Sequence, residues 1–187
     1  MILKSKNNRQ VLLRRLNIND LDDLFDYLQN LSAETKNRFG PHKSDKQSII
    51  DFYTPGDLNS GYIACDIVTN QIVAYFIIKT GYLEHDAVRL QSCGIVPDNK
   101  TDCTFAPSVA DSWQSCGIGG QLFRFILTDL KTTEISRIIL WGGVQTDNIK
   151  AVNFYKKNKF KILGKFTHNG ENYDMYYDII KTNIVTH

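Results

Sequence analysis

The sequence of 187 residues predicts a mixed α/β fold in a single domain. Extended apolar segments alternate with amphipathic helical segments along the chain. Asn169-Gly170 separates two strand-like segments near the C-terminus, and this dipeptide is typical of a tight hairpin because both positions tolerate positive φ. The continuous apolar run Ile138-Ile139-Leu140-Trp141 indicates a strand that is buried on both faces.

The elements follow from periodicity and from turn residues. We expect first a strand at 11–16 and a helix with Leu21, Leu24, Phe25, Leu28 and Leu31 on its apolar face. A polar loop at 32–44, which could contain a helical turn, then leads to a short segment at 49–52. Next come strands at 62–68 and 71–79, an extended segment at 104–110, a glycine turn at 114–120 leading into a helix, a strand at 137–144, a helix at 148–158, and strands at 161–167 and 173–180. Asn19 or Asp20 is the expected cap of the first helix. Residues 80–102 fit either an extra strand at 87–95 or an irregular insertion.

Composition excludes several classes of protein. The 22 basic and 20 acidic residues give a net charge of +2, which is far from the basic stripe of a nucleic-acid-binding protein. The longest apolar run, 72–78, is too short to cross a membrane. The four cysteines lack the spacing of a zinc site, and without a secretory signal we expect free thiols. These features predict a soluble, cytoplasmic protein that binds no nucleic acid, membrane or metal.

A glycine-containing turn, Gln114-Ser115-Cys116-Gly117-Ile118-Gly119-Gly120, leads directly from an extended segment into a helix. The unpaired amides and the dipole at such a helix start favour a phosphate, and glycine allows its close approach. A dinucleotide-binding fingerprint would need its third glycine where Leu122 or Phe123 stands, and an acidic residue further along. A P-loop would need Gly-Lys-Ser/Thr. The sequence has neither, so the remaining alternative is a turn that is merely tight.

A second motif follows at Asn148-x-x-Ala151-x-x-Phe154-Tyr155-x-Lys157. Together, the two motifs resemble those of the GCN5-related N-acetyltransferase (GNAT) superfamily, and the similarity extends from about residue 10 to 180. The resemblance implies a mostly antiparallel central sheet flanked by helices, a C-terminal hairpin, and one acetyltransferase domain over 1–187. It also implies acetyl-CoA as cofactor, and a small-molecule or peptide amine as acceptor. A homodimer is a further assembly to consider.

The resemblance assigns roles to individual residues. Backbone amides from Cys116 to Gly120 would hold the pyrophosphate, and Val109 and Ala110 would bind the pantetheine and the acetyl carbonyl through the main chain. The full set implied for the cofactor is Val109, Ala110, Gln114, Ser115, Cys116, Gly117, Ile118, Gly119, Gly120, Asn148 and Ala151. Tyr155 falls on the tyrosine that protonates the departing thiolate in many members, and core packing is its alternative role.

Two positions depart from the family pattern. Lys159 replaces the usual glycine, and we expect Asn158 to adopt the left-handed conformation in its place. The fourth-strand stretch 103–108 contains no carboxylate, although many members have a glutamate base there.

Glu34, Arg38 and His42 are candidates for the acceptor pocket, with His42 a candidate base. Their alternative is a solvated loop in which Arg38 pairs with an acid.

The sequence therefore favours an acetyl-CoA-dependent N-acetyltransferase that works by direct attack of an amine on the thioester. The missing carboxylate favours an alternative, a non-catalytic acyl-CoA-binding or interaction module. A thiol enzyme using Cys116 is a weaker hypothesis, since the sequence lacks a cysteine–histidine signature.

Overall fold

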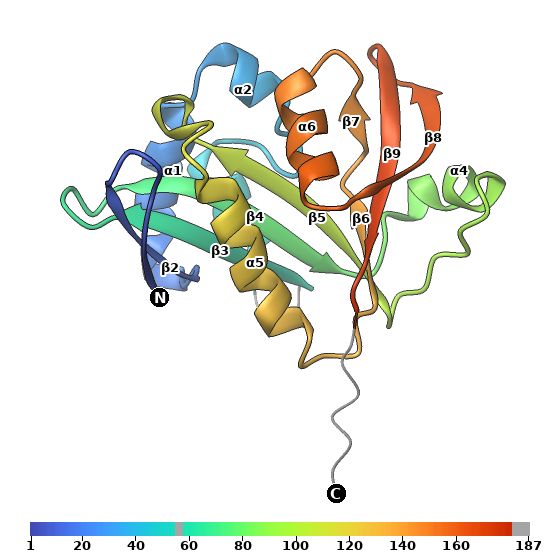
Figure 1. The fold of residues 1–187 in the computed structure, drawn as a ribbon, viewed down its shortest axis with the longest axis horizontal. Helices are drawn as coiled ribbons and strands as arrows, with labels where there is room; N and C mark the ends of the chain where they lie inside the picture. The colour runs from blue at the N-terminus through green and yellow to red at the C-terminus, as the bar shows by residue number, and fades with distance from the viewer. Residues whose placement is uncertain (55–57, 181–187) are drawn as a thin grey trace, which may run out of the picture. The chain divides into compact units, whose positions relative to one another are not determined.

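The computed structural model describes residues 1–54 and 58–180. The chain divides into two compact units, one containing Met1–Lys79 and Phe105–Ile126, the other containing Thr80–Thr104 and the chain from Leu127 onward. Helices and antiparallel strands occur in both units (Figure 1), so the mixed, mostly antiparallel α/β class is confirmed. Within the described ranges, no helix has the length and apolar character needed to span a membrane.

The first unit is built on five neighbouring strands in the order β1-β2-β3-β4-β5. Their bounds are β1 Ile2–Lys4, β2 Gln10–Arg15, β3 Asn59–Asp66, β4 Ile72–Thr80 and β5 Asp102–Val109, the last of which begins in the second unit. The pairs β1–β2, β2–β3 and β3–β4 are antiparallel. Strand β1, which the sequence analysis missed, is a short partner of β2.

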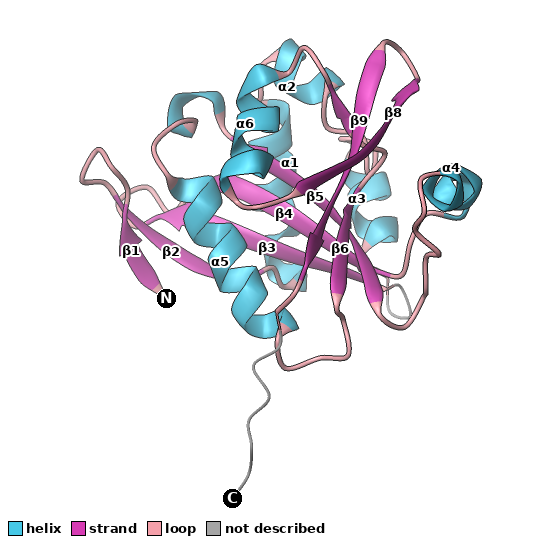
Figure 2. Cartoon of the chain, turned by 45° about the vertical axis from the view of Figure 1, so that its right-hand side comes forward, coloured by secondary structure: helices cyan, strands magenta, loops and turns pink. Residues whose placement is uncertain are grey.

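Helices flank these strands on both sides, with α1 behind β2–β4 and α5 in front of them (Figure 2). The helices of this unit are α1 Leu21–Gln29, α2 Ala33–Asn37, α3 Lys46–Phe52, and the part of α5 (Ile118–Leu130) that runs to Ile126. Helix α2 lies in the segment 32–44, where a loop that could contain a helical turn was expected. Ser32 caps it by accepting a hydrogen bond from the Thr35 amide.

The cap expected at the start of the first helix is only partly correct. Asp20 occupies the N-cap position of α1 but makes no side-chain capping bond. Its carboxylate instead accepts hydrogen bonds from the Asn17 amide and from the Arg14 guanidinium. Asn17, rather than Asn19, provides the capping side chain, for the 3-10 turn Ile18–Asp20 that precedes α1.

The core of the first unit joins β4, β5 and α5 through aromatic rings. Phe105 lies with its ring centroid 5.4 Å from both Phe76 and Phe123, and all three side chains are buried. Every residue of Ile72–Ile78 is also buried, which explains the continuous apolar run in the sequence. This packing fixes the end of β5 and the first turns of α5, between which the glycine turn lies.

The second unit is organised around β9. Its strands are β6 Arg137–Leu140, β7 Val144–Gln145, β8 Lys161–Thr167 and β9 Glu171–Asp178, and β9 pairs antiparallel with the other three. The hairpin turn is confirmed, since Asn169 and Gly170 both have positive φ. The single strand expected at 137–144 is wrong: Gly142 and Gly143 adopt positive φ and divide it into β6 and β7.

The segment 80–102, for which a strand was one alternative, is helical in its middle. A 3-10 turn at Glu84–Asp86 precedes α4, Ala87–Ser92. Leu90 is buried with Ile95 and Ile139, and Arg89 hydrogen-bonds the buried Asp174. A single buried apolar residue, Leu90, and the ion pairs of Arg89 with Asp174 and Asp86 thus anchor this helix. Its sequence therefore lacks the apolar periodicity that predicts a helix.

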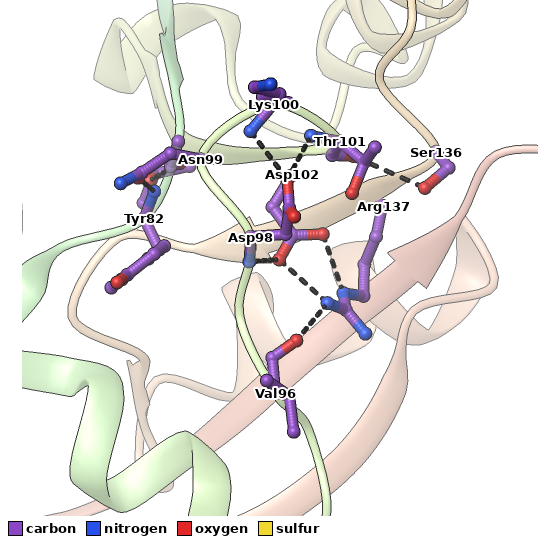
Figure 3. A network of polar contacts seen from close by, with 11 residues as sticks. Tyr82, Val96, Asp98, Asn99, Lys100, Thr101, Asp102, Ser136 and Arg137 are labelled. Carbon is purple, nitrogen blue, oxygen red and sulfur yellow. Dashed lines mark hydrogen bonds and ion pairs between the residues drawn. The ribbon is translucent and has the colours of Figure 1, made fainter.

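The chain after α4 is held by a buried carboxylate (Figure 3). Asp102 is fully buried and accepts two hydrogen bonds from Arg137, at 2.9 and 2.7 Å, and one from the Asp98 amide at 2.8 Å. Arg137 also donates to the Val96 carbonyl. The network joins the start of β5, the start of β6 and the loop between α4 and β5.

Helix α6, Ile149–Lys157, confirms the helix expected at 148–158. Its end differs from expectation, because Asn158 has φ −88° and Lys159 itself adopts the left-handed conformation with φ 67°. The Phe160 amide donates to the Tyr155 carbonyl and the Lys159 amide to the Lys156 carbonyl. This pair of bonds is the Schellman motif, which requires the left-handed residue at position 159.

Candidate functional site

The glycine turn in the first unit exposes the amides at the start of α5. Ser115 and Gly117 have φ 61° and 84°, and the helix begins at Ile118. The first backbone bond of the helical pattern runs from the Gln121 amide to the Gly117 carbonyl, at 3.3 Å. Four amides come before this bond and have no carbonyl acceptor within the helix: those of Gly117, Ile118, Gly119 and Gly120.

The charges around this turn suit an anion. The first turn of α5 contains no acidic side chain. The nearest carboxylate in the sequence, Asp111, accepts hydrogen bonds from the Ser32 amide and hydroxyl and from the Thr35 hydroxyl. Partial burial opposes its ionisation, but these hydrogen bonds outweigh burial and lower the pKa of Asp111. Its negative charge is thus directed to the start of α2, and the turn fits a pyrophosphate.

The turn between β1 and β2 packs against the glycine turn. The Lys6 amide donates to the Cys116 carbonyl at 2.9 Å, and the Asn7 side chain donates to the Cys116 sulfur at 3.2 Å. The Arg9 guanidinium lies 3.4 Å from the centroid of the Trp113 ring. Cys116 is 6% exposed, so its thiol is covered, which weighs against its use as a nucleophile.

The end of β5 supplies the other cofactor candidates of the first unit. The Ala110 amide donates to the Val73 carbonyl at 2.9 Å, which continues the pairing of β4 with β5. The Gln114 side chain donates to the Val109 carbonyl at 3.3 Å. Gln114 is therefore directed back toward β5, and it contributes no charge where the family often has arginine.

Asn148, in the second unit, is the N-cap of α6. Its side-chain oxygen accepts a hydrogen bond of 3.2 Å from the Ala151 amide. The spacing Asn-x-x-Ala is thus explained by helix capping, which fixes the start of α6. This role occupies the carbonyl oxygen of the Asn148 side chain.

Tyr155 lies two turns further along α6 and is 6% exposed. Its ring packs against Phe154 and Phe160, with centroids 5.3 and 5.2 Å away. Burial raises the pKa of the Tyr155 phenol above its usual value, so the hydroxyl stays protonated.

The acceptor candidates on α2 form an ion pair with each other. Arg38 Nη1 lies 3.0 Å from Glu34 Oε1 across one helical turn. The Glu34 side chain is largely exposed, and Arg38 pairs with a nearby acid as the alternative interpretation expected, in a short helix and not in a loop. Such an exposed pair contributes little to stability.

His42 belongs to a chain of polar aromatic side chains. His42 Nδ1 lies 2.8 Å from the Lys43 carbonyl and Nε2 lies 3.0 Å from the Tyr75 hydroxyl. A carbonyl can only accept, so Nδ1 carries the proton and Nε2 accepts from Tyr75. The Tyr75 oxygen in turn accepts from Tyr53, at 2.6 Å. Burial lowers the pKa of His42 and favours this neutral form, in which both ring nitrogens are engaged.

Strand β5 contains no carboxylate over residues 103–108, and it carries a buried hydroxyl near its end. Ser108 is buried, and its oxygen lies 2.9 Å from the Tyr27 hydroxyl of α1.

A cleft of about 530 Å³ lies in the first unit, and Tyr27 is one of its lining residues. Its walls are α1, the β3–β4 turn and the segment Ala110–Trp113, and they carry the carboxylates of Asp23, Asp26 and Asp111.

The family model for acetyltransferases of the GNAT family matches residues 25–160. The chain belongs to the GNAT acetyltransferase family. GNAT acetyltransferases use acetyl-CoA, so the expected cofactor is confirmed at the level of the family.

Solved structures share this fold at low sequence identity. The GNAT domain of PAT from S. lividans is 15% identical with a TM-score of 0.74, covering 95% of this chain and 96% of that one. A GNAT-family acetyltransferase from Streptococcus pneumoniae is 17% identical (TM-score 0.68, 90% and 99% covered). The aminoglycoside acetyltransferase AAC(6′)-Ib, solved in complex with coenzyme A, is 19% identical (TM-score 0.65, 90% and 94% covered). No curated protein matches the sequence significantly.

Several residues around these sites were missed by the sequence analysis of this GNAT protein. They are Lys6, Arg9, Tyr27, Tyr53, Tyr75 and Asp111. Their contacts join segments that are far apart in the sequence, and none of them lies at a position of either motif. Only Asp111 could have been found from the sequence, because it lies three residues before Gln114, where the glycine turn begins.

Proposed function

We propose that this protein transfers the acetyl group of acetyl-CoA to a primary amine of a small-molecule or peptide acceptor, as one N-acetyltransferase domain over 1–187. The observation that carries the proposal is the glycine turn. Its first-turn amides have no intrahelical acceptor, and no acidic side chain lies in the first turn of α5. Together with membership of the GNAT family, these features support acetyl-CoA binding at Gln114–Gly120.

The proposed reaction is a direct transfer. When bound, acetyl-CoA supplies a thioester whose carbonyl carbon the amine attacks. The new C–N bond replaces the C–S bond, the nitrogen loses a proton, and the sulfur leaves as a thiolate that takes up a proton. We assign the delivery of that proton to Tyr155, because it stands at the tyrosine position of the second motif and a phenol is protonated at neutral pH.

The proton lost by the amine goes to solvent in this proposal. Residues 103–108 of β5 contain no carboxylate, and both nitrogens of His42 are engaged. The amine would therefore react in its neutral form, with water accepting the proton. Main-chain groups of Val109 and Ala110, and the cap residues Asn148 and Ala151, are proposed to contact the pantetheine and acetyl groups.

The same lack of a carboxylate supports a second candidate, a non-catalytic acyl-CoA-binding module. The two candidates differ in turnover rather than in binding. An acceptor screen with thiol detection of released coenzyme A separates them, using amino sugars, polyamines, amino acids, aminoglycosides and peptide N-termini, with mass spectrometry of the acceptor. Coenzyme A release matched by acetylation of an amine supports the enzyme. Tight binding of acetyl-CoA without acetylation of any of these amines supports the binding module.

A further inference from the structure

The turn between β1 and β2 places a lysine beside the glycine turn. The stem of Lys6 packs over Gly117: its Cγ and Cε lie 3.5 and 3.7 Å from the point that a Cβ on Gly117 would occupy. The ammonium nitrogen is one bond of about 1.5 Å beyond Cε, so it lies within about 5 Å of that point. The positive charge of this exposed lysine therefore lies close to Gly117, the first of the residues whose amides precede the first helical bond of α5.

This position is fixed by backbone contacts as well as by the side chain. The Lys6 amide donates to the Cys116 carbonyl, and the Lys4 carbonyl accepts from the Gln121 side chain at 2.9 Å. On the other side of the β1–β2 turn, Arg9 stacks on Trp113 and donates to the Ser112 carbonyl at 3.0 Å. The turn is therefore attached at both ends to the segment from Ser112 to Gln121.

The glycine turn itself lacks a positively charged side chain, and Lys6 supplies one. Gln114 is neutral and directed toward the Val109 carbonyl, and residues 114–123 contain no basic side chain. The Arg9 guanidinium is already engaged by Trp113 and Ser112. Coenzyme A carries a pyrophosphate and a 3′-phosphate, whose negative charges the neutral amides of the turn offset only in part.

We infer that Lys6 is a phosphate-binding residue of the cofactor site and pairs its ammonium with a phosphate of bound coenzyme A. This inference rests on the proposed function, because it takes the glycine turn as the site of the cofactor. It assigns the β1–β2 turn, which lies outside both sequence motifs, to the binding site.

The test is titration calorimetry of the full chain with coenzyme A, comparing wild type with Lys6→Gln at low and high salt. Lys6→Gln should raise Kd about two- to fivefold at low salt, which lies within the range for a solvent-exposed ion pair. The difference should shrink at high salt, where such pairs are screened. Lys46→Gln is the matched control, since Lys46 is exposed in the same unit and pairs with Asp22.

A parallel titration with 3′-dephospho-coenzyme A identifies the phosphate. Loss of the Lys6 effect with this ligand assigns Lys6 to the 3′-phosphate, and persistence assigns it to the pyrophosphate; both support the inference. Equal affinity of wild type and Lys6→Gln at low salt, or equal weakening by Lys46→Gln, overturns it while leaving the proposed function intact. Failure of the wild type to bind coenzyme A overturns both.

Discussion

The backbone amide of Lys6 donates a 2.9 Å hydrogen bond to the carbonyl oxygen of Cys116. This bond connects the turn before β2 to the turn before α5, two segments that lie far apart in the sequence. The glycine turn is thus supported by a tertiary partner in addition to its own backbone preferences. A preorganised turn loses less conformational freedom when it binds a ligand.

Replacement of Tyr155 tests the proposed acid. Tyr155→Phe should lower kcat by about tenfold, less than the roughly 10²–10⁴-fold typical of general-acid catalysis, because a thiolate is a good leaving group. Acetyl-CoA affinity should remain nearly unchanged. Steady-state kinetics with an acceptor from the screen, together with a melting temperature, provide the measurement. A normal kcat with a lowered melting temperature would instead identify Tyr155 as a packing residue.

The pH dependence of stability tests the state of His42. Burial lowers the folded-state pKa of His42 below its ordinary value of 6.5, so the unfolded chain binds a proton more readily. The stabilisation from neutral His42 is therefore complete above about pH 6.5 and is lost as the pH falls toward the folded-state pKa. Urea unfolding of wild type and His42→Gln from pH 7.5 to 5 measures this. Parallel curves for the two proteins would show that His42 does not contribute.

The buried carboxylate of the second unit predicts a large effect on stability. Arg137→Met leaves Asp102 buried without its cationic partner and should cost about 3–5 kcal/mol. Lys161→Met, which removes the exposed partner of Asp178, should change stability far less. Chemical denaturation compares the two variants. Similar small losses in both would mean that the Asp102 network contributes no more than a surface ion pair.

The left-handed residue after α6 predicts a stabilising change. Lys159→Gly should raise the free energy of unfolding by about 1 kcal/mol, because glycine adopts positive φ without a Cβ penalty. Asn158→Gly is the control: Asn158 has φ −88° and its side chain donates to the Phe154 carbonyl, so this change should destabilise. A destabilised Lys159→Gly would show that the lysine side chain makes a compensating contact.

Local signals in the sequence predicted most of the fold. The hairpin at Asn169-Gly170 and the helix at 149–157 were correctly predicted because their turn residues and apolar periods are local. Helix α4 was not, since Arg89 and Leu90 are held by partners elsewhere in the chain. The break between β6 and β7 depends on positive φ at Gly142 and Gly143, within a segment that otherwise has the composition of a strand.

The candidate site likewise contains residues that local sequence patterns identified and residues that they did not. The motif residues of the glycine turn could be identified because family motifs are contiguous. The contacts of Lys6, Asp111 and Tyr75 depend on which loops meet, and a single sequence does not encode that as a local pattern. The pairing of Glu34 with Arg38 is local, at a spacing of four residues, and was anticipated as an alternative to a role in binding the acceptor.

The most direct test of the account is the binding of acetyl-CoA to wild type, Gly119→Ala and Gly119→Asp. Gly119 lies in the first turn of α5, where an aspartate is compatible with the helix dipole, so all three proteins should fold. We predict that acetyl-CoA binds the wild type and raises its melting temperature, that Gly119→Ala binds more weakly, and that Gly119→Asp loses about 100-fold or more in affinity through repulsion of the pyrophosphate. Equal stabilisation of wild type and Gly119→Asp by acetyl-CoA would contradict the assignment of the glycine turn as the cofactor site.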